Sequence, residues 1–287
     1  LKNEDLFKRR ILGLTSYFKS AQEKLLPQYD NNRDFQIIRV PMSNHQLLEY
    51  SLARKRERTE NKNKKPKADK NMYKETISTY RIFSRELCNF VFPPEYPRPS
   101  TKLKEADPTK QEEFEDESEI ASSFEFDYAE ELNKALAFLK ENGNKYLTKE
   151  GLENLSPKFL HMLEQLDDEE NEGLHLVYSQ FRTIEGIGVI KLILEQNGYA
   201  EFKLTRVSGE WDIKPENPED EGKPRFVLYT GTETEEEKEI IRNVYNSNWS
   251  QLSSTIRNKL EKIHENNFMG EIIKIFMITS SGAEGIN

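Results

Sequence analysis

A short stretch near the end of the sequence joins an apolar run to hydroxyl and glycine residues. Residues 272–278 are apolar and rich in β-branched side chains, and Thr279, Ser280, Ser281 and Gly285 follow. Such a short run indicates a strand buried on both faces. Hydroxyls and glycines after it could turn O–H and N–H groups toward a phosphate. The alternative is a polar loop that binds nothing, because short Ser/Gly loops are common.

Two further apolar segments end in short polar loops. Residues 174–178 precede Ser179 and Gln180, and residues 225–229 precede Thr230, Gly231 and Thr232. The carboxyl ends of parallel strands meet at one edge of a sheet, and open α/β sheets bind ligands there. The sequence therefore predicts one ligand-binding edge made of three loops.

Alternating helical and extended patterns would position these loops. Helices are expected over residues 132–139, 156–166, 184–196, 234–245 and 249–265, and a further strand over residues 199–204. Ser156 before Pro157, and Thr234 with Glu237, are typical helix starts. The β-α-β order predicts a parallel sheet covered by helices on both faces, which is an α/β fold.

The first half of the chain has a less regular pattern. Helical spacing is present over residues 6–19, 44–58 and 73–80, a strand is expected over residues 35–40, and residues 82–92 form a unit that a group of prolines ends. We interpret the basic residues 54–70 as a solvated insertion, with a phosphate-contacting arm as the alternative. The acidic residues 97–131 are interpreted as a linker without fixed structure. The expected domains are residues 1–96, this linker, and residues 132–287.

Composition limits the classes of protein that the chain can represent. It has 287 residues, 35% hydrophobic and 32% charged, which suffices for a sizeable core. The net charge of −9 argues against indiscriminate nucleic-acid binding, although a local basic surface remains possible. A single cysteine, Cys88, and four scattered histidines make a metal site unexpected. Without a membrane-length apolar run or a signal peptide, we expect an intracellular protein with no membrane partner.

Several stretches, taken in order, resemble the second RecA-like lobe of superfamily 2 helicase-like ATPases. LHLVYSQF, YTGTETEEEKEIIRNVYN and IKIFMITSSGAEGIN are similar to motifs IV, IVa and V. VPMSNHQLLEY, SRELCNFVFP and SPKFLHMLEQL resemble segments of Swi/Snf-type ATPases, although Phe90 stands where that family has histidine. The likeness extends in particular to the Swi/Snf-like helicases and nucleoside triphosphatases of large cytoplasmic DNA viruses.

The resemblance implies the C-terminal lobe of an ATP-dependent nucleic-acid translocase or helicase. It places Glu284, Gly285 and Asn287 toward the nucleotide. It places six residues along the nucleic acid, with DNA expected rather than RNA: Gln180, Gly231, Thr232, Thr279, Ser280 and Ser281. Carboxylates crowd the helix start after Thr232 and would repel a phosphate, so any contact there must come from Gly231 and Thr232.

Two phosphate-handling motifs are absent from the sequence. It contains no G-x-x-x-x-G-K-[ST] loop, and no Gln-x-x-Gly-Arg follows the last strand. We therefore expect ATP and Mg to be held mainly by a first RecA-like lobe in cis, no catalytic residue in this chain, and no hydrolysis by it alone. Because the chain starts at Leu1 and stops in mid-pattern, both ends are expected to be cuts in a longer polypeptide.

Two other functions remain open. The first is a non-catalytic RecA-like interaction module of a viral transcription complex, which the long charged insertions favour. With either function, a viral protein of this kind is expected in the cytoplasm or in the virion. The second is an unrelated dinucleotide or nucleotide-sugar enzyme. The lack of G-x-G-x-x-G after a first strand argues against that enzyme.

Overall fold

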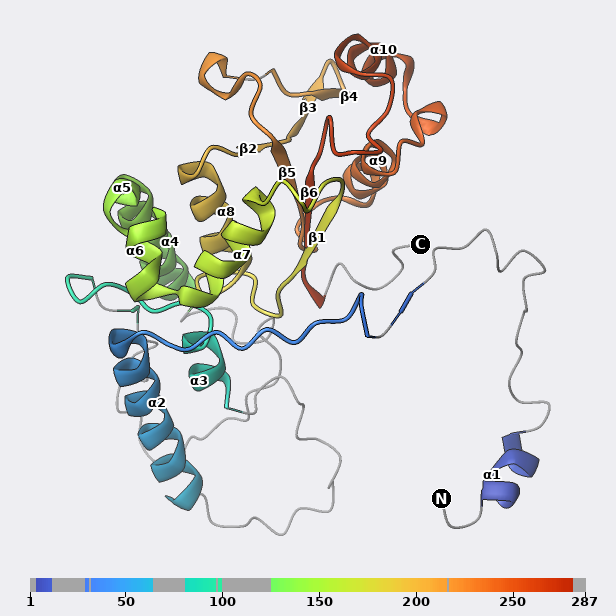
Figure 1. Cartoon of the computed structure of the whole chain (residues 1–287). Coiled ribbons are helices and arrows are strands. Elements are labelled where there is room, and N and C mark those ends of the chain that lie inside the picture. Colours follow the sequence, from blue (N-terminus) through green and yellow to red (C-terminus); the bar gives the residue numbers. More distant parts are fainter. Residues whose placement is uncertain are drawn as a thin grey trace. The chain divides into compact units, whose positions relative to one another are not determined.

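The computed structural model describes residues 4–11, 29–30, 32–63, 81–96, 98–99, 125–215 and 217–280 (Figure 1). The chain divides into two units, residues 1–39 and residues 40–287. Among the described helices, none combines the length and the apolar character needed to cross a membrane. The predicted helix over residues 73–80 lies outside the described residues, as do residues 64–70 of the basic run and residues 101–124 of the acidic run.

The first unit contains helix α1 (Glu4–Ile11), which overlaps the first part of the predicted helix over residues 6–19; residues 12–19 lie outside the described residues. The strand predicted over residues 35–40 is wrong, because these residues form no strand. The apolar side chains on which that prediction depended are exposed, by 57% for Phe35 and 73% for Ile37. An apolar run becomes a strand only where a neighbouring strand takes its backbone hydrogen bonds, and among the described residues none pairs with it.

The second unit is built on a four-stranded parallel sheet. Its strands are β1 (His175–Tyr178), β2 (Ala200–Glu201), β5 (Arg225–Tyr229) and β6 (Ile275–Ile278), in the order β1-β6-β5-β2. All three neighbouring pairs are parallel. The predicted α/β class is confirmed: a parallel sheet with helices around it, as in a RecA-like lobe.

The central strand β6 holds the two sides of the core together. Ile275 and Met277 belong to a buried cluster on one side, and Phe276 and Ile278 belong to a second cluster on the other. All four side chains are buried, as predicted for a strand covered on both faces. The ring of Phe276 packs against Tyr229 and Tyr245, with centroids 5.2 and 4.8 Å away.

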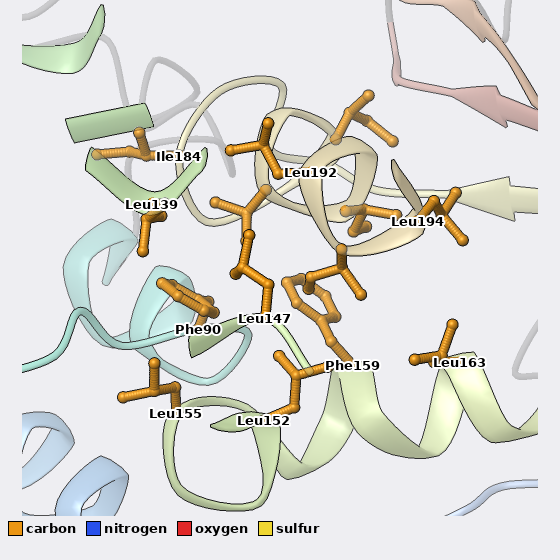
Figure 2. Close-up of a cluster of buried hydrophobic side chains, with 14 of the residues drawn as sticks. Phe90, Leu139, Leu147, Leu152, Leu155, Phe159, Leu163, Ile184, Leu192 and Leu194 are labelled. Carbon is orange, nitrogen blue, oxygen red and sulfur yellow. The ribbon is translucent and has the colours of Figure 1, made fainter. Parts of the chain in front are cut away.

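Helices supply the rest of the two clusters. The first cluster includes α4 (Glu125–Glu141), α5 (Gly143–Tyr146), α6 (Lys149–Leu155), α7 (Pro157–Asp167) and α8 (Ile187–Gln196). The second includes α9 (Glu235–Tyr245) and α10 (Ser254–Ile263). Figure 2 shows leucines of this cluster from α4, α6, α7 and α8 together with Phe90 and Phe159. Phe90 is fully buried and its ring meets that of Phe92 edge to face. Packing therefore explains why an apolar ring stands where Swi/Snf-type ATPases have histidine.

The predicted helix starts are confirmed where side chains cap them. The Ser156 hydroxyl accepts the N–H of Phe159 at 3.1 Å at the start of α7, and the Thr234 hydroxyl accepts the N–H of Glu237 at 3.2 Å at the start of α9. Helix α4 begins at Glu125, seven residues before the start of the predicted helix over residues 132–139.

Two helices from the first half of the sequence complete the unit. They are α2 (Asn44–Asn63) and α3 (Ile82–Leu87). Helix α2 extends nine residues past Arg54, so the first part of the basic run interpreted as a solvated insertion is helical. The Gln46 amide donates to the Leu87 carbonyl at 2.9 Å, and Glu57 accepts from the N–H of Ser84 at 3.0 Å, which fixes α3 against α2.

A β-hairpin was missed by the sequence analysis. Strands β3 (Leu204–Val207) and β4 (Glu210–Ile213) pair antiparallel, and only the first residue of β3 lies in a predicted strand, that over residues 199–204. Ser208 and Gly209 have φ angles of 53° and 89°, which is the geometry of a tight two-residue hairpin turn. Only two residues of the predicted strand 199–204 remain in the main sheet, as β2.

Candidate nucleic-acid interface

Strands β1, β6 and β5 end at the same level of the sheet. Tyr178 and Tyr229 both lie in register with Ile278, the last residue of β6. The loops that follow are bonded to one another, because the N–H of Ser179 donates to the Ile278 carbonyl at 3.1 Å and the Thr279 hydroxyl donates to the Thr230 carbonyl at 3.2 Å. The prediction that three polar loops start at one edge is confirmed for the described residues.

The loop after β5 is closed by its own carboxylate. Glu233 accepts the N–H groups of Thr230 and Gly231 at 2.8 and 2.9 Å, and the hydroxyls of Thr230 and Thr232 at 3.1 Å each. Gly231 and Thr232 are exposed, as a nucleic-acid contact requires. Their donors, however, are already bonded to an anion. A phosphate could take them only by displacing Glu233.

The loop after β6 places one of its predicted residues inward. Thr279 is buried and its hydroxyl bonds to Thr230, so it stabilises the edge and does not present a donor to a ligand. Ser280 is exposed and remains available as a contact. Ser281, Glu284, Gly285 and Asn287 lie outside the described residues, and their assignments remain predictions.

The loop after β1 folds tightly back on itself. The N–H of Ile187 donates to the Phe181 carbonyl at 3.0 Å, and the N–H of Gly188 donates to the Arg182 carbonyl at 2.9 Å. A Cβ atom on Gly186 would lie 1.7 Å from the Phe181 carbonyl oxygen. Only glycine fits this position, because the obstructing atoms belong to the backbone.

Gln180 projects from this loop and is held by a residue that the sequence analysis did not select. The guanidinium of Arg85, on α3, donates to the Gln180 side-chain carbonyl and also lies over the Phe181 ring, 5.6 Å from its centroid. Gln180 is exposed and Arg85 is half-buried. The edge therefore carries an amide, a guanidinium and an aromatic ring in contact, a combination suited to nucleic acid.

An ion pair between the half-buried Arg98 and the buried Glu185 ties the far end of the same loop to the segment after α3. Arg98 donates to the carboxylates of Glu185 and Glu86, the latter at 2.7 Å. Burial raises the pKa of the Glu185 carboxyl, and the charge of Arg98 opposes that shift. Loss of Arg98 is costly, because it would leave the carboxylate of Glu185 buried without its cation.

Asn89 connects two segments that the resemblance to Swi/Snf-type ATPases had singled out separately, residues 84–93 and 156–166, and joins both to the loop after β1. Its amide nitrogen donates to the Glu185 carbonyl at 2.9 Å, and its side-chain oxygen accepts from Lys158 at 2.8 Å. The Ser156 hydroxyl donates to the Asn89 backbone carbonyl. Asn89, Ser156 and Lys158 thus act in the structure as supports of the loop and not as contacts of a ligand.

The described part of the edge does not fit a triphosphate. The loop with the most backbone donors holds Glu233, whose charge would oppose the phosphates. Within the same described residues no group of three His, Cys, Asp or Glu side chains is arranged to hold a metal ion. We therefore assign no step of ATP chemistry to these residues.

With the geometry established, comparison with known proteins gives distant viral relatives. The chain is 24% identical to the "Putative ATP-dependent RNA helicase R350" of Acanthamoeba polyphaga mimivirus over 99% of its own length, which is 36% of that protein. It is 28% identical over 47% of its length to the "Termination factor NPH-I homolog" of two African swine fever virus isolates, covering 19% of each. The chain is a distant homologue of viral helicases.

These similarities cover a part of each relative. The chain spans about a third of the mimivirus protein and about a fifth of the swine fever virus proteins. No family model matches the chain, and no solved structure matches it.

Proposed function

We propose that the chain is the C-terminal RecA-like lobe of a Swi/Snf-like, ATP-dependent nucleic-acid translocase or helicase. In this proposal the carboxyl edge of the sheet is part of the nucleic-acid track, with Gln180, Gly231, Thr232 and Ser280 in contact and Thr279 supporting them from within. Residues 132–287 form the lobe, and residues 1–96 lead into it. The proposed location is the cytoplasm of an infected cell or the virion, with viral transcription proteins as further partners.

The observation that carries this proposal is that strands β1, β5 and β6 end at the same level of the sheet. It brings an exposed amide, an exposed glycine and an exposed serine to one edge beside the guanidinium of Arg85. The distant viral helicase relatives add independent support from the sequence.

In this proposal, ATP is bound by other parts of the protein. Glu284, Gly285 and Asn287 would line one wall of a cleft, and a first lobe in cis would hold most of the ATP with Mg. The chain alone is therefore proposed to have no ATP hydrolase activity.

A non-catalytic module of a viral transcription complex is the second candidate. The Glu233 carboxylate in the loop after β5 favours it, since an anion already holds the donors of that loop. ATP hydrolysis stimulated by nucleic acid, in a protein that carries this chain together with an upstream lobe, would contradict the second candidate.

The test is binding of the 287-residue chain to a labelled DNA oligonucleotide, measured by fluorescence anisotropy. Gln180→Ala should weaken binding by about fivefold, the value of one neutral hydrogen bond. Gln196→Ala is the matched control, because this exposed amide lies at the end of α8 and outside the three loops. Equal effects of the two variants, or no binding by the unmodified chain, would contradict the proposed track.

A further inference from the structure

The donors of the loop after β5 form one compact set around a single carboxylate. One oxygen of Glu233 accepts the N–H groups of Thr230 and Gly231 at 2.8 and 2.9 Å, and the other accepts the hydroxyls of Thr230 and Thr232 at 3.1 Å each. Gly231 has a φ of 92°, a left-handed conformation that lets consecutive N–H groups converge on one atom. Each oxygen of the carboxylate therefore takes two donors.

These donors suit a phosphate as well as a carboxylate. A phosphodiester also presents two charged oxygens, and backbone N–H groups and hydroxyls bind it in the same way. None of these donors is an N–H of helix α9, whose start is capped separately by the Thr234 hydroxyl, 3.2 Å from the N–H of Glu237. The set belongs to the edge of the sheet, because the Thr230 carbonyl accepts the Thr279 hydroxyl.

The carboxylate that fills the loop is open to replacement. Glu233 is half-buried, and its bonds are to uncharged N–H and O–H groups. Lys238, its nearest base along the chain, pairs with Glu235 at 2.9 Å. Burial raises the pKa of the Glu237 carboxyl, and the negative charge of Glu233 adds to this rise. Glu233 thus lies close to a like charge, which favours its movement out of the loop.

We propose that Glu233 is a built-in competitor of nucleic acid, and that a backbone phosphate takes its place when nucleic acid binds. The inference rests on the proposed function, which it deepens by giving the loop after β5 a means of regulation. In the free chain Glu233 keeps the donors of Thr230, Gly231 and Thr232 satisfied. On binding, the phosphate accepts these donors and the carboxylate turns into solvent. The contact therefore forms only where the rest of the track already holds the strand.

A variant without the charge of Glu233 but with nearly its shape tests the competition. Glu233→Gln should raise DNA affinity about tenfold in the anisotropy assay, because a neutral amide binds the same donors more weakly than a carboxylate does. Glu239→Gln is the matched control, since it removes the same charge from an exposed position on α9. It should raise the affinity by about twofold at most, the general effect of one negative charge fewer at a solvated site.

Inorganic phosphate separates the anion site from the nucleic-acid track. In NMR spectra of the 287-residue chain with Glu233→Gln, the amide signals of Thr230 and Gly231 should shift when millimolar phosphate is added. The same signals of the unmodified chain should stay in place. Glu233→Ala removes the competing side chain entirely and should respond at least as strongly as Glu233→Gln. Thermal unfolding of each variant checks that it is folded.

The outcomes distinguish the inference from the proposed function. Equal gains in DNA affinity for Glu233→Gln and Glu239→Gln would overturn the inference and leave the track intact. So would a phosphate response that is the same in the unmodified chain and in both Glu233 variants, or absent from all three. No DNA binding by the unmodified chain would overturn the proposed track, whereas a phosphate response confined to the Glu233 variants would still support the anion site.

Discussion

Glu233 puts a carboxylate into the loop where a phosphate was expected. It accepts two backbone N–H groups and two hydroxyls from three consecutive residues. A carboxylate and a phosphate use the same donors, so the loop has the chemistry of an anion site that its own chain fills. Sequence reasoning identified the repelling charge of the later glutamates but not this bond, because a side chain that folds back on its own loop leaves no periodic pattern.

Gly186 determines the shape of the loop that carries Gln180. Gly186→Ala should displace this loop, because the new Cβ atom would lie 1.7 Å from the Phe181 carbonyl oxygen and 2.4 Å from its carbon. We expect DNA affinity to fall at least as far as in Gln180→Ala, together with a lower melting temperature.

Gly143→Ala is the matched control for this prediction. Its Cβ atom would also meet an atom too closely, the Gln196 side-chain oxygen at 2.3 Å, but the end of a flexible side chain can move aside. The control should fold and bind DNA normally. Equal behaviour of the two variants in calorimetry and in the binding assay would show that the loop is not fixed in the way described.

At the scale of elements, α3 depends on one buried carboxylate for its position. Burial raises the pKa of Glu57, but the Ser84 N–H, the Arg54 guanidinium and the Ser84 hydroxyl together hold that pKa below its ordinary value. A carboxyl with a depressed pKa stabilises the fold above its unfolded pKa, roughly 4.3, and loses this contribution as the pH falls through the folded value.

Glu57→Gln should therefore destabilise the chain by about 2 kcal/mol at pH 7, the value of hydrogen bonds to a charged group. The difference from the unmodified chain should shrink as the pH falls below the ordinary carboxyl pKa, roughly 4.3, and disappear once Glu57 is protonated in the folded chain as well. Urea unfolding of both proteins across this pH range measures the difference in their free energies of unfolding. Glu130→Gln, in an exposed pair, should change little at either pH. A pH-independent difference for Glu57→Gln would contradict the role of its charge.

The elements themselves were largely predictable from the sequence. Local signals predicted most of them: apolar runs, helical spacing of apolar residues, and capping residues such as Ser156 and Thr234. These signals identified strands β1, β5 and β6 and helices α7, α8 and α9. The β3–β4 hairpin was missed because its strands are short and half-exposed. Residues 35–40 were wrongly assigned because pairing between strands depends on a partner elsewhere in the chain.

At the scale of the whole molecule, the sequence predicted which loops meet but not what supports them. A common edge follows from parallel strands alone, and the structure confirms it. The contacts of Arg85 with Gln180, and of Asn89 with Glu185, join residues about 95 positions apart. Such contacts depend on how α3 packs, which no local pattern in a single sequence records.

The most direct test of the central claim is hydrogen exchange of the 287-residue chain with and without DNA. If the carboxyl edge of the sheet is the nucleic-acid track, DNA should slow exchange in peptides covering residues 178–183, 229–234 and 278–281 together. Peptides at the opposite ends of the strands, residues 170–175 and 268–274, should not change. Protection confined to those opposite ends, with none in the three loops, would contradict the claim.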